Sequence, residues 1–573
     1  MESLMTNKID LHANPFYLTD EDIRWVEETK ENMSTEEKVG QLFCPIAPGP
    51  DKAALQDVLD TLHPGGMMFR ALPGKEIQGA QRYLQEKSAV PLLLAANLEA
   101  GGNGVMSEGT YFGYPMEMAA TGDTVHAYHL GKVSAAEGNA TGCNWAFSPI
   151  VDRNVNYLNP ITNVRTYGDD TDTVIAMSKA FSKGVQEEGM AVAIKHFPGD
   201  GMDYRDQHLH PTINSCSAEE WDETYGEIYR QLIAAGAESV MVGHILQPAW
   251  QQKLNPSLEL KDLLPATLSP ELLQGLLREH LGFNGLIITD ATPMGGFTNA
   301  LSRKDAVPMA IAAGCDMFLF NRNMAEDFRF MLDGLKQGIL TEERLNEAVT
   351  RILALKAHLK LHLRQKEGKL VPDEAALQEV LDRKEFKKWA EDAADKATTL
   401  VKDTQQALPL NPATQKRLLL YVFGDEWGYF GNGSAKLFKK LLEEAGFTVD
   451  VFDKEAMRFA YIDIKRADIV KQYDAVIYYA NIEPASNKST LRMEWNWPMA
   501  SNMPWFIHDL PVIGVATGSP YLLQDMPALK TLVNGYTAAP AMLKAIVDKL
   551  TGKSEFVGKS PVDPFCGMWQ TKF

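Results

Sequence analysis

The chain has 573 residues, of which 45% are hydrophobic and 23% are charged, a composition typical of soluble globular proteins. With 56 Lys and Arg against 75 Asp and Glu, its formal charge is −19, which argues against nucleic-acid partners and against an anionic membrane surface. The five cysteines form no CxxC pair, which argues against a disulfide framework and favours a reducing compartment.

The opening stretch MESLMTNKIDLHANPFYLTDED is polar and acidic, unlike a secretory signal peptide. No uninterrupted apolar run approaches the ~20 residues that span a bilayer. We therefore expect a cytoplasmic protein without a membrane partner.

Short apolar runs alternate with amphipathic helical stretches over the first part of the chain. The runs are almost continuously hydrophobic, which is typical of strands buried on both faces of a parallel sheet. Eight such units predict an α/β fold, a TIM-type (β/α)₈ barrel, whereas an open doubly wound sheet would not usually need eight. The predicted strands are residues 41–47, 65–70, 92–99, 144–152, 191–198, 238–245, 285–291 and 315–321.

The second half of the chain changes pattern twice. Residues 344–363 predict a closing helix, and residues 365–403 are charged and mostly helical. A second alternation of strands and helices then predicts a smaller α/β sandwich with an open, mostly parallel sheet. The predicted domains are a barrel over 1–363, a helical linker over 364–403 and an α/β domain over 404–573.

Polar residues gather at the C-terminal ends of the predicted strands, the edge where barrel enzymes build their active sites. We expect this edge to hold the functional residues. They are Asn97, Glu99, Asp152, Lys195, His196, His244, Asp290 and Asn321.

The densest polar cluster is KHFPGDGMDYRDQHLHP, at residues 195–211. One interpretation is a metal site that uses His196, His208 and His210 with nearby carboxylates. A second is a solvated surface loop. A third is a dyad in which Asp206 orients the imidazole of His208, which can both give and take a proton near neutral pH.

Asp290 ends an apolar strand, where an unpartnered carboxylate would be costly to bury. It could cap the next helix, as could Thr292. Alternatively, it is a carboxylate nucleophile held at the rim of the barrel.

Several motifs in order along the chain resemble family 3 glycoside hydrolases. Residues 195–199, KHFPG, with the following Asp206-x-His208, resemble that family's KHFPG…DxH signature, most closely in its β-N-acetylglucosaminidase branch. The stretch from Gly282 to Asp290 resembles the segment that carries the family's nucleophile. Further similar segments are FSPIVD, the stretch from Asn159 to Asp169, MVGHI, PATLSP, AAGCD and TRILALK.

The resemblance implies retaining exo-hydrolysis of terminal β-linked N-acetylglucosamine or a related sugar. Asp290 would be the nucleophile that forms a covalent glycosyl-enzyme, and His208, with Asp206 as its partner, would replace the usual second carboxylate as acid/base. Lys195, His196 and Arg165 would clamp the sugar hydroxyls. Asn97, Glu99, Asp152 and His244 complete the expected substrate site, with no metal and no cofactor.

Two positions depart from the family pattern at this site. The third-strand motif reads NLEAGGNGV, so Asn97 stands where an Asp is usual and the expected Arg is absent. Losing a charge-assisted hydrogen bond there costs about 1–2 kcal/mol. The motif PGHG reads PGDG, with Asp200 in place of His. Both changes suggest an altered sugar specificity or a reduced activity.

Three alternatives to the hydrolase stay open at this point. A β-N-acetylglucosaminide phosphorylase could use the same site, because a His acid/base places no anion beside a phosphate acceptor. A catalytically weakened sugar-binding relative would explain the changed third-strand motif. A metal-dependent barrel hydrolase would be distinguished by sensitivity to chelators.

Overall fold

The computed structural model describes residues 9–424, 433–452, 465–495, 497 and 501–573, which divide into two compact units. The first unit comprises residues 1–110, 127–156 and 171–384, and the second comprises residues 111–126, 157–170 and 385–573. The second unit thus takes two segments from within the first part of the chain. The domain boundaries that the sequence suggested, at residues 363 and 403, stay predictions.

The first unit is built around eight short parallel strands, and each of the eight predicted apolar runs contains one of them. Their side chains are all buried, which explains why the runs lack polar alternation. The strands are β1 (Phe43–Cys44), β2 (Gly66–Phe69), β3 (Leu93–Ala96), β4 (Trp145–Ala146), β5 (Ala191–Phe197), β7 (Ser239–Val242), β9 (Leu286–Thr289) and β10 (Phe318–Leu319).

The strands close into a barrel. Six of them pair side by side in the order β2-β3-β4-β5-β7-β9, and β1 pairs with β10. Parallel bridges from Ile46 to Met68 and from Ile288 to Met317 join these two sheets at both ends. The predicted (β/α)₈ barrel is therefore confirmed.

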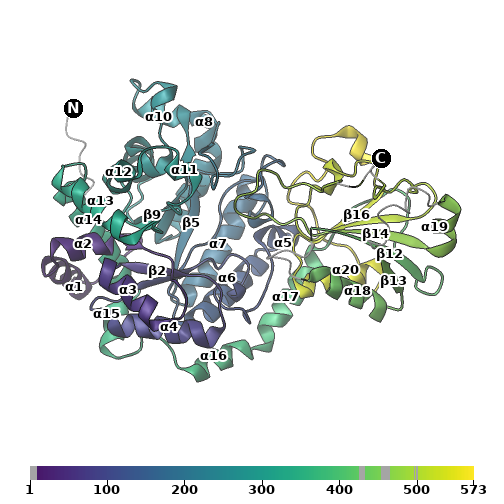
Figure 1. The fold of residues 1–573 in the computed structure, drawn as a ribbon, viewed down its shortest axis with the longest axis horizontal. Helices are drawn as coiled ribbons and strands as arrows, with labels where there is room; N and C mark the ends of the chain where they lie inside the picture. The colour runs from purple at the N-terminus through teal and green to yellow at the C-terminus, as the bar shows by residue number, and fades with distance from the viewer. Residues whose placement is uncertain (1–8, 425–432, 453–464, 496, 498–500) are drawn as a thin grey trace. The chain divides into compact units, whose positions relative to one another are not determined.

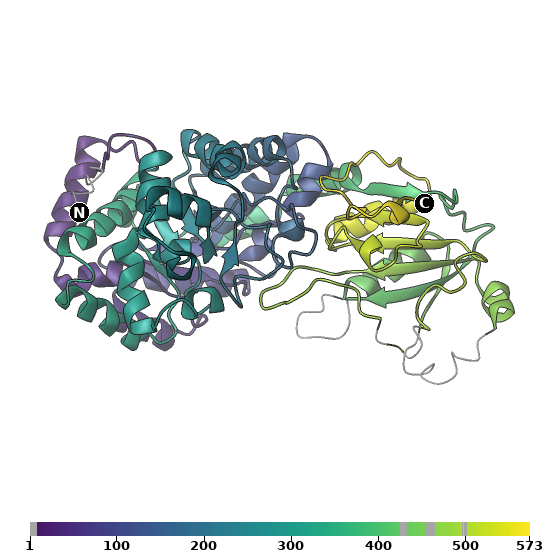
Figure 2. The same ribbon diagram turned by 90° about the horizontal axis from the view of Figure 1, so that it is seen from above.

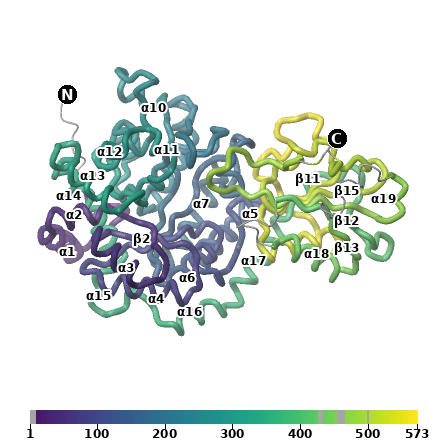
Figure 3. The backbone as a smooth tube through the Cα atoms, in the orientation of Figure 1, coloured from purple at the N-terminus to yellow at the C-terminus, as the bar shows by residue number. Residues whose placement is uncertain are grey.

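Helices lie outside the strands of this unit (Figure 1). Two of the first helices begin with capping boxes, in which Thr19 and Ser34 exchange hydrogen bonds with Asp22 and Glu37. Figure 3 shows α1 and α2 beside α14, although these helices are far apart in the sequence. The helices are α1 (Asp20–Glu31), α2 (Thr35–Gln41), α3 (Lys52–Leu62), α4 (Gly74–Lys87), α6 (Thr124–Thr141), α7 (Thr171–Glu187), α8 (Ala218–Trp221), α9 (Glu227–Ala234), α10 (Pro248–Leu254), α11 (Gly295–Thr298), α12 (Arg303–Ala313), α13 (Met324–Lys336), α14 (Glu342–His358), α15 (Leu361–Lys366) and α16 (Glu374–Leu381).

A small two-stranded sheet lies beside the C-terminal ends of β5 and β7. It pairs β6 (Thr212–Ile213) with β8 (Ile245–Leu246). β6 follows the loop of residues 198–211, and β8 directly follows β7. This pairing fixes the far end of the polar loop beside the neighbouring strand of the barrel.

Among its described residues, the second unit is built around a six-stranded sheet in the order β11-β16-β15-β14-β12-β13, in which β11 is antiparallel to β16 and the other neighbouring strands are parallel. Its strands, green to yellow, run side by side in Figure 2. The prediction of an open, mostly parallel α/β sheet is confirmed. Its elements are α5 (Pro115–Ala120), α17 (Lys384–Ala397), β11 (Thr399–Asp403), β12 (Arg417–Phe423), α18 (Ser434–Glu444), β13 (Thr448–Val451), α19 (Arg466–Gln472), β14 (Ala475–Ala480), β15 (Val512–Ala516), β16 (Thr531–Asn534) and α20 (Pro540–Leu550).

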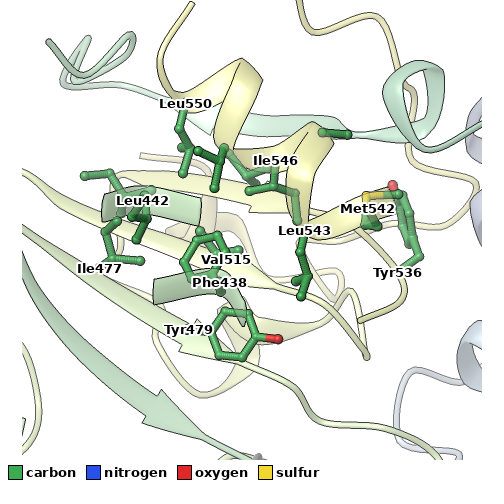
Figure 4. Packing of buried hydrophobic residues seen from close by; sticks show 14 of the residues in the cluster. Phe438, Leu442, Ile477, Tyr479, Val515, Tyr536, Met542, Leu543, Ile546 and Leu550 are labelled. Atoms are coloured by element: carbon green, nitrogen blue, oxygen red, sulfur yellow. The ribbon is translucent and has the colours of Figure 1, made fainter. Parts of the chain in front are cut away.

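The sheet of the second unit is covered on both faces. Side chains alternate along a strand, so Leu418 and Leu420 of β12 join one core while Leu419 and Tyr421 join the other. Figure 4 shows the first core, in which α18 and α20 pack on β14 and β15 through Phe438, Leu442, Ile477, Tyr479, Val515, Met542, Leu543, Ile546 and Leu550.

Within the described residues, none of the helices combines the length and the apolar character that crossing a bilayer requires.

Candidate active site

A buried lysine occupies the C-terminal end of β5. The Lys195 side chain is almost fully buried, and its Nζ lies 2.7 Å from Glu99 Oε1 and 3.3 Å from Asn97 Oδ1. The carboxylate of Glu99 compensates the buried ammonium, as a buried charge requires. Asn97 is itself exposed, so its amide is open to a bound molecule.

The next residue of β5 belongs to a carboxylate–imidazole pair. His196 Nδ1 lies 2.7 Å from Asp152 Oδ2, and the backbone N–H groups of His196 and Asp200 both donate to Asp152 Oδ1. The pairing of β5 with β7 shifts register between Lys195 and Phe197. This irregularity lets the consecutive side chains of Lys195 and His196 both lie at the same edge of the barrel.

Asp290 directly follows β9. Its Oδ1 accepts a hydrogen bond of 2.7 Å from the backbone N–H of Ala291, and its Oδ2 lies 3.8 Å from His196 Nε2. Burial alone would raise the pKa of this carboxyl, but the neighbouring imidazoles, His196 foremost, and the hydrogen bond from the Ala291 N–H outweigh that effect and lower the pKa. Asp290 is therefore a carboxylate at neutral pH, with Oδ2 as its less occupied oxygen.

His244 is a neutral imidazole. Burial lowers its pKa to about 4, against the opposing charge of Asp290. Its Nε2 lies 3.1 Å from the carbonyl oxygen of Ala291 and its Nδ1 lies 3.0 Å from Thr267 Oγ1. A carbonyl only accepts, so Nε2 carries the proton and Nδ1 accepts from the Thr267 hydroxyl. His244 thus holds the residue after Asp290 in place.

A second carboxylate–imidazole pair lies in the polar loop. His208 Nδ1 lies 2.7 Å from Asp206 Oδ1, which also accepts the backbone N–H of His208 at 2.8 Å. Asp206 is buried, whereas 23% of the His208 side chain is exposed. Because a carboxylate only accepts, Nδ1 carries a proton toward Asp206, and Nε2 is the ring nitrogen that faces away from this carboxylate.

Two glycines bring the loop after β9 against this pair. The N–H of Gly295 donates to the carbonyl of His208 at 2.7 Å, and that of Gly296 donates to the carbonyl of Gln207 at 3.1 Å. A Cβ at Gly295 would lie 2.1 Å from the Leu209 carbonyl oxygen, so only glycine permits this approach. The backbone therefore ties the Asp290 loop to the His208 loop.

The structure brings nine of the ten predicted site residues to one edge of the barrel. The tenth, Arg165, lies in the second unit, where its Nη1 donates to the Ile161 carbonyl at 3.1 Å. Asn321, also expected at this edge, donates to Asp327 Oδ2 at 3.3 Å. The assignment of all ten to catalysis and sugar binding stays a prediction.

Sequence reasoning did not assign a role to Gln207. Its Nε2 donates to Asp200 Oδ2 at 3.2 Å, and its Oε1 accepts the backbone N–H of His244 at 2.8 Å. Asp200 is buried near Asp152, and burial raises the pKa of its carboxyl well above the usual range. The signal available in the sequence was position alone, because Gln207 stands between Asp206 and His208.

Chemically, the edge combines an ionised carboxylate with an imidazole that a second carboxylate orients. Such a set can attack an electrophilic carbon and move a proton to and from an adjacent oxygen. Within the described part of the chain, no three His, Cys, Asp or Glu side chains are grouped to hold a metal ion.

Comparison with known proteins identifies the relatives of the chain. Residues 34–355 match the model of the glycosyl hydrolase family 3 N-terminal domain. A β-N-acetylglucosaminidase/β-glucosidase from Cellulomonas fimi is 42% identical over 98% of this chain and all of its own length. β-Hexosaminidase A from Pseudoalteromonas piscicida is 30% identical over 48% of this chain and 49% of its own.

Two solved structures have the same fold. β-Glucoside phosphorylase BglX is 44% identical, with a TM-score of 0.92 over 98% of this chain and 99% of its own. A family 3 β-N-acetylglucosaminidase from Paenibacillus sp. str. FPU-7 is 24% identical, with a TM-score of 0.79 over 94% of this chain and 100% of its own, a likeness of fold alone.

Proposed function

Because the chain belongs to glycosyl hydrolase family 3 and is a glycoside hydrolase, we propose that it is a retaining exo-β-N-acetylhexosaminidase. Its substrate would carry terminal β-linked N-acetylglucosamine or a related sugar. The observation that carries the proposal is the Asp206–His208 pair, whose imidazole lies near enough to lower the pKa of Asp290.

In the first step of the proposed reaction, Asp290 Oδ2 attacks the anomeric carbon. The bond to the leaving oxygen breaks, and His208 gives that oxygen its proton from Nε2. The product is a glycosyl ester on Asp290. Oδ1 keeps its hydrogen bond from the Ala291 N–H, which leaves Oδ2 for the attack.

In the second step, water attacks the same carbon and His208 Nε2 takes its proton. The ester bond breaks, and Asp290 returns as a carboxylate. Asp206 holds Nδ1 throughout, so the same ring nitrogen serves both proton transfers.

Sugar recognition in this proposal rests on the polar groups around Asp290. Lys195 and His196 would bind sugar hydroxyls, and the same role for Arg165 rests on the family resemblance alone. Asn97 is exposed beside Lys195, which suits a hydrogen bond to one substituent of the ring. Glu99, Asp152 and His244 would hold these groups in place.

Phosphorolysis is the second candidate function. The favouring observation is the 44% identity, over 98% of this chain, with a structure named as a β-glucoside phosphorylase. In that case phosphate would replace water in the second step. An imidazole acid/base adds no negative charge beside such an acceptor.

The test is release of p-nitrophenol from the β-N-acetylglucosaminide and the β-glucoside, with and without phosphate. We expect cleavage of the amino-sugar glycoside and a loss of about 10⁴-fold or more in kcat for Asp290→Asn. Asp333→Asn, on the outer helix α13, is the matched control and should keep full activity.

The outcomes separate the alternatives. Phosphate stimulation with a sugar 1-phosphate product would establish the phosphorylase. Cleavage of the glucoside alone would contradict the amino-sugar assignment. No cleavage of either, with sugar binding retained, would establish a binding protein.

We also propose a cytoplasmic location, supported by five cysteines that are all free and buried. Cell fractionation followed by immunodetection tests it, and recovery outside the cytoplasm would contradict it.

A further inference from the structure

Arg70 directly follows β2, just as Asp290 directly follows β9. All strands of the barrel are parallel, so both residues stand at the C-terminal edge that holds the candidate active site. Arg70 is exposed, and it forms no hydrogen bond or ion pair with any residue that the structure describes. The mechanism proposed above gives it no role.

The register of β2 and β3 determines what Arg70 lies beside. The two parallel strands end on the pair of Phe69 with Ala96. Continued by one residue, the same register pairs Arg70 with Asn97. Neighbouring strands of a sheet are about 4.8 Å apart, so the two residues are adjacent at this edge.

Contacts that cross an intervening strand identify the inner face of the barrel. Trp145 Nε1, on β4, donates to Ser239 Oγ, on β7, at 2.8 Å, across β5. Lys195 Nζ, on β5, lies 3.3 Å from Asn97 Oδ1, which follows β3, across β4. Side chains from strands that are not neighbours approach each other on the concave face of a closed sheet. These four side chains therefore face the inside of the barrel.

Arg70 shares that face. Side chains alternate along a strand, and paired positions on neighbouring parallel strands point to the same side of the sheet. Arg70 and its register partner Asn97 are both exposed, so a guanidinium and a carboxamide lie side by side at the open edge of the barrel. They face the same space as Lys195.

Arg70 differs in its charge balance from three basic side chains of the candidate site. Each of those three has a carboxylate at 2.7 Å, in the pairs Lys195–Glu99, His196–Asp152 and His208–Asp206. The guanidinium of Arg70 has no such partner among the described residues. It offers five N–H donors, has no acceptor and keeps its charge, so it fits an oxyanion better than a neutral hydroxyl group.

An anion that binds at this edge has to overcome the charge of Asp290. Asp290 is a carboxylate at neutral pH and repels a second negative charge. A cation without a carboxylate of its own offsets that repulsion. Lys195 is compensated by Glu99, whereas Arg70 supplies such a cation.

We propose that Arg70 binds an anionic oxygen group of a molecule that reacts at the candidate active site, with the Asn97 amide beside it. The inference deepens the proposed function and rests on it for the reaction that follows binding. Two sources share the required chemistry. One is inorganic phosphate that takes the place of water as acceptor, and the other is a carboxylate carried by the sugar.

The test is calorimetric titration of the full chain with inorganic phosphate and with sodium glucuronate, a sugar that carries a carboxylate. Both are titrated at neutral pH and at constant ionic strength in chloride. We expect saturable binding of at least one probe, with a dissociation constant below about 10 mM. Saturation by phosphate alone identifies an acceptor, saturation by glucuronate alone identifies an acidic sugar, and saturation by both identifies a site that accepts either.

Three variants locate the binding. Arg70→Met removes the guanidinium and should weaken binding at least about 10-fold. Arg70→Lys keeps the charge without the planar fork, so it should bind more tightly than Arg70→Met and less tightly than the parent. Arg24→Met, at an exposed position of α1, is the matched control and should bind as the parent does. Arg70→Met removes no hydrogen bond to the described residues, so it should fold as the parent does, which circular dichroism checks.

The proposal is overturned if neither probe gives a saturable signal, or if Arg70→Met binds both probes as tightly as the parent. The p-nitrophenyl assay separates this failure from a failure of the proposed function. Glycoside cleavage without saturable binding of a probe overturns the role of Arg70 alone. Binding that Arg70→Met loses, in a protein that cleaves no glycoside, supports the role of Arg70 and contradicts the proposed function.

Discussion

The candidate active-site edge holds two carboxylate–imidazole pairs with the same distance between Nδ1 and the carboxylate. In Asp152–His196 and in Asp206–His208, the carboxylate lies 2.7 Å from Nδ1. In both pairs the backbone N–H of the histidine also donates to that carboxylate. Each histidine is therefore held by one carboxylate through both its ring and its backbone.

Their surroundings differ. His196 lies on β5 with 8% of its side chain exposed, and its Nε2 faces Asp290 at 3.8 Å. His208 lies on a loop with 23% of its side chain exposed. An enclosed imidazole beside a carboxylate can stabilise the negative charge of that carboxylate, whereas a more exposed one can exchange protons with a substrate or with water. In the proposed mechanism the two pairs would therefore serve two purposes, according to their positions on the fold.

The largest expected effect is the loss of proton transfer by the Asp206–His208 pair. His208→Gln should lower kcat by about 10²- to 10⁴-fold on an alkyl glycoside, whose leaving oxygen needs a proton. The loss should be smaller on the p-nitrophenyl glycoside, because that leaving group departs as an anion. Steady-state kinetics on both substrates measures the difference.

His210→Gln is the control for this prediction, since His210 is exposed on the same loop. Equal losses on the two leaving groups would break the assignment of His208 to proton transfer.

The next effect concerns the Asp152–His196 pair and the pKa of Asp290. His196 lowers the pKa of Asp290, and the nucleophile must be ionised, so activity should persist as pH falls below the usual carboxyl range. His196→Gln removes that effect, so the acid limb of kcat/KM should move to higher pH, with a loss of about 10- to 100-fold at neutral pH.

The pH profile of kcat/KM, with folding checked by circular dichroism at each pH, measures this shift. An acid limb at the same pH in both proteins would show that His196 does not set the charge state of Asp290.

A smaller effect tests the role of Asp206 in the Asp206–His208 pair. Asp206→Asn keeps an acceptor for Nδ1–H but removes the negative charge that stabilises the imidazolium. We expect about a 10-fold loss in kcat/KM. Asp203→Asn removes the partner of Arg205 on the same loop and should leave kcat/KM close to that of the parent. A loss of equal size in both variants would indicate loop distortion instead.

The smallest effect concerns specificity. Asn97→Asp would place a carboxylate 3.3 Å from Lys195 and restore the residue that is usual in the family. A charge-assisted hydrogen bond worth about 1–2 kcal/mol corresponds to roughly a 5- to 30-fold change in kcat/KM. Comparing a panel of N-acyl and C4- or C6-substituted glycosides measures it. An unchanged ranking across the panel would show that Asn97 contacts no substituent.

Much of this architecture can be predicted from short segments of the sequence. The eight apolar runs contain all eight barrel strands, because strands buried on both faces must be hydrophobic along their whole length. Asp290 and the pair Asp206–His208 are also local features. Asp290 directly follows a strand. Asp206 and His208 are two residues apart and form a hydrogen bond with each other.

Only the tertiary structure decided which distant groups meet. The bond from Lys195 to Glu99 and the hydrogen bond from the His244 N–H to Gln207 both join residues far apart in sequence. Arg165 stands among barrel segments in the chain but belongs to the second unit. Periodicity reports which face of an element is buried, whereas such contacts depend on barrel closure and on the register of neighbouring strands, which no single segment encodes.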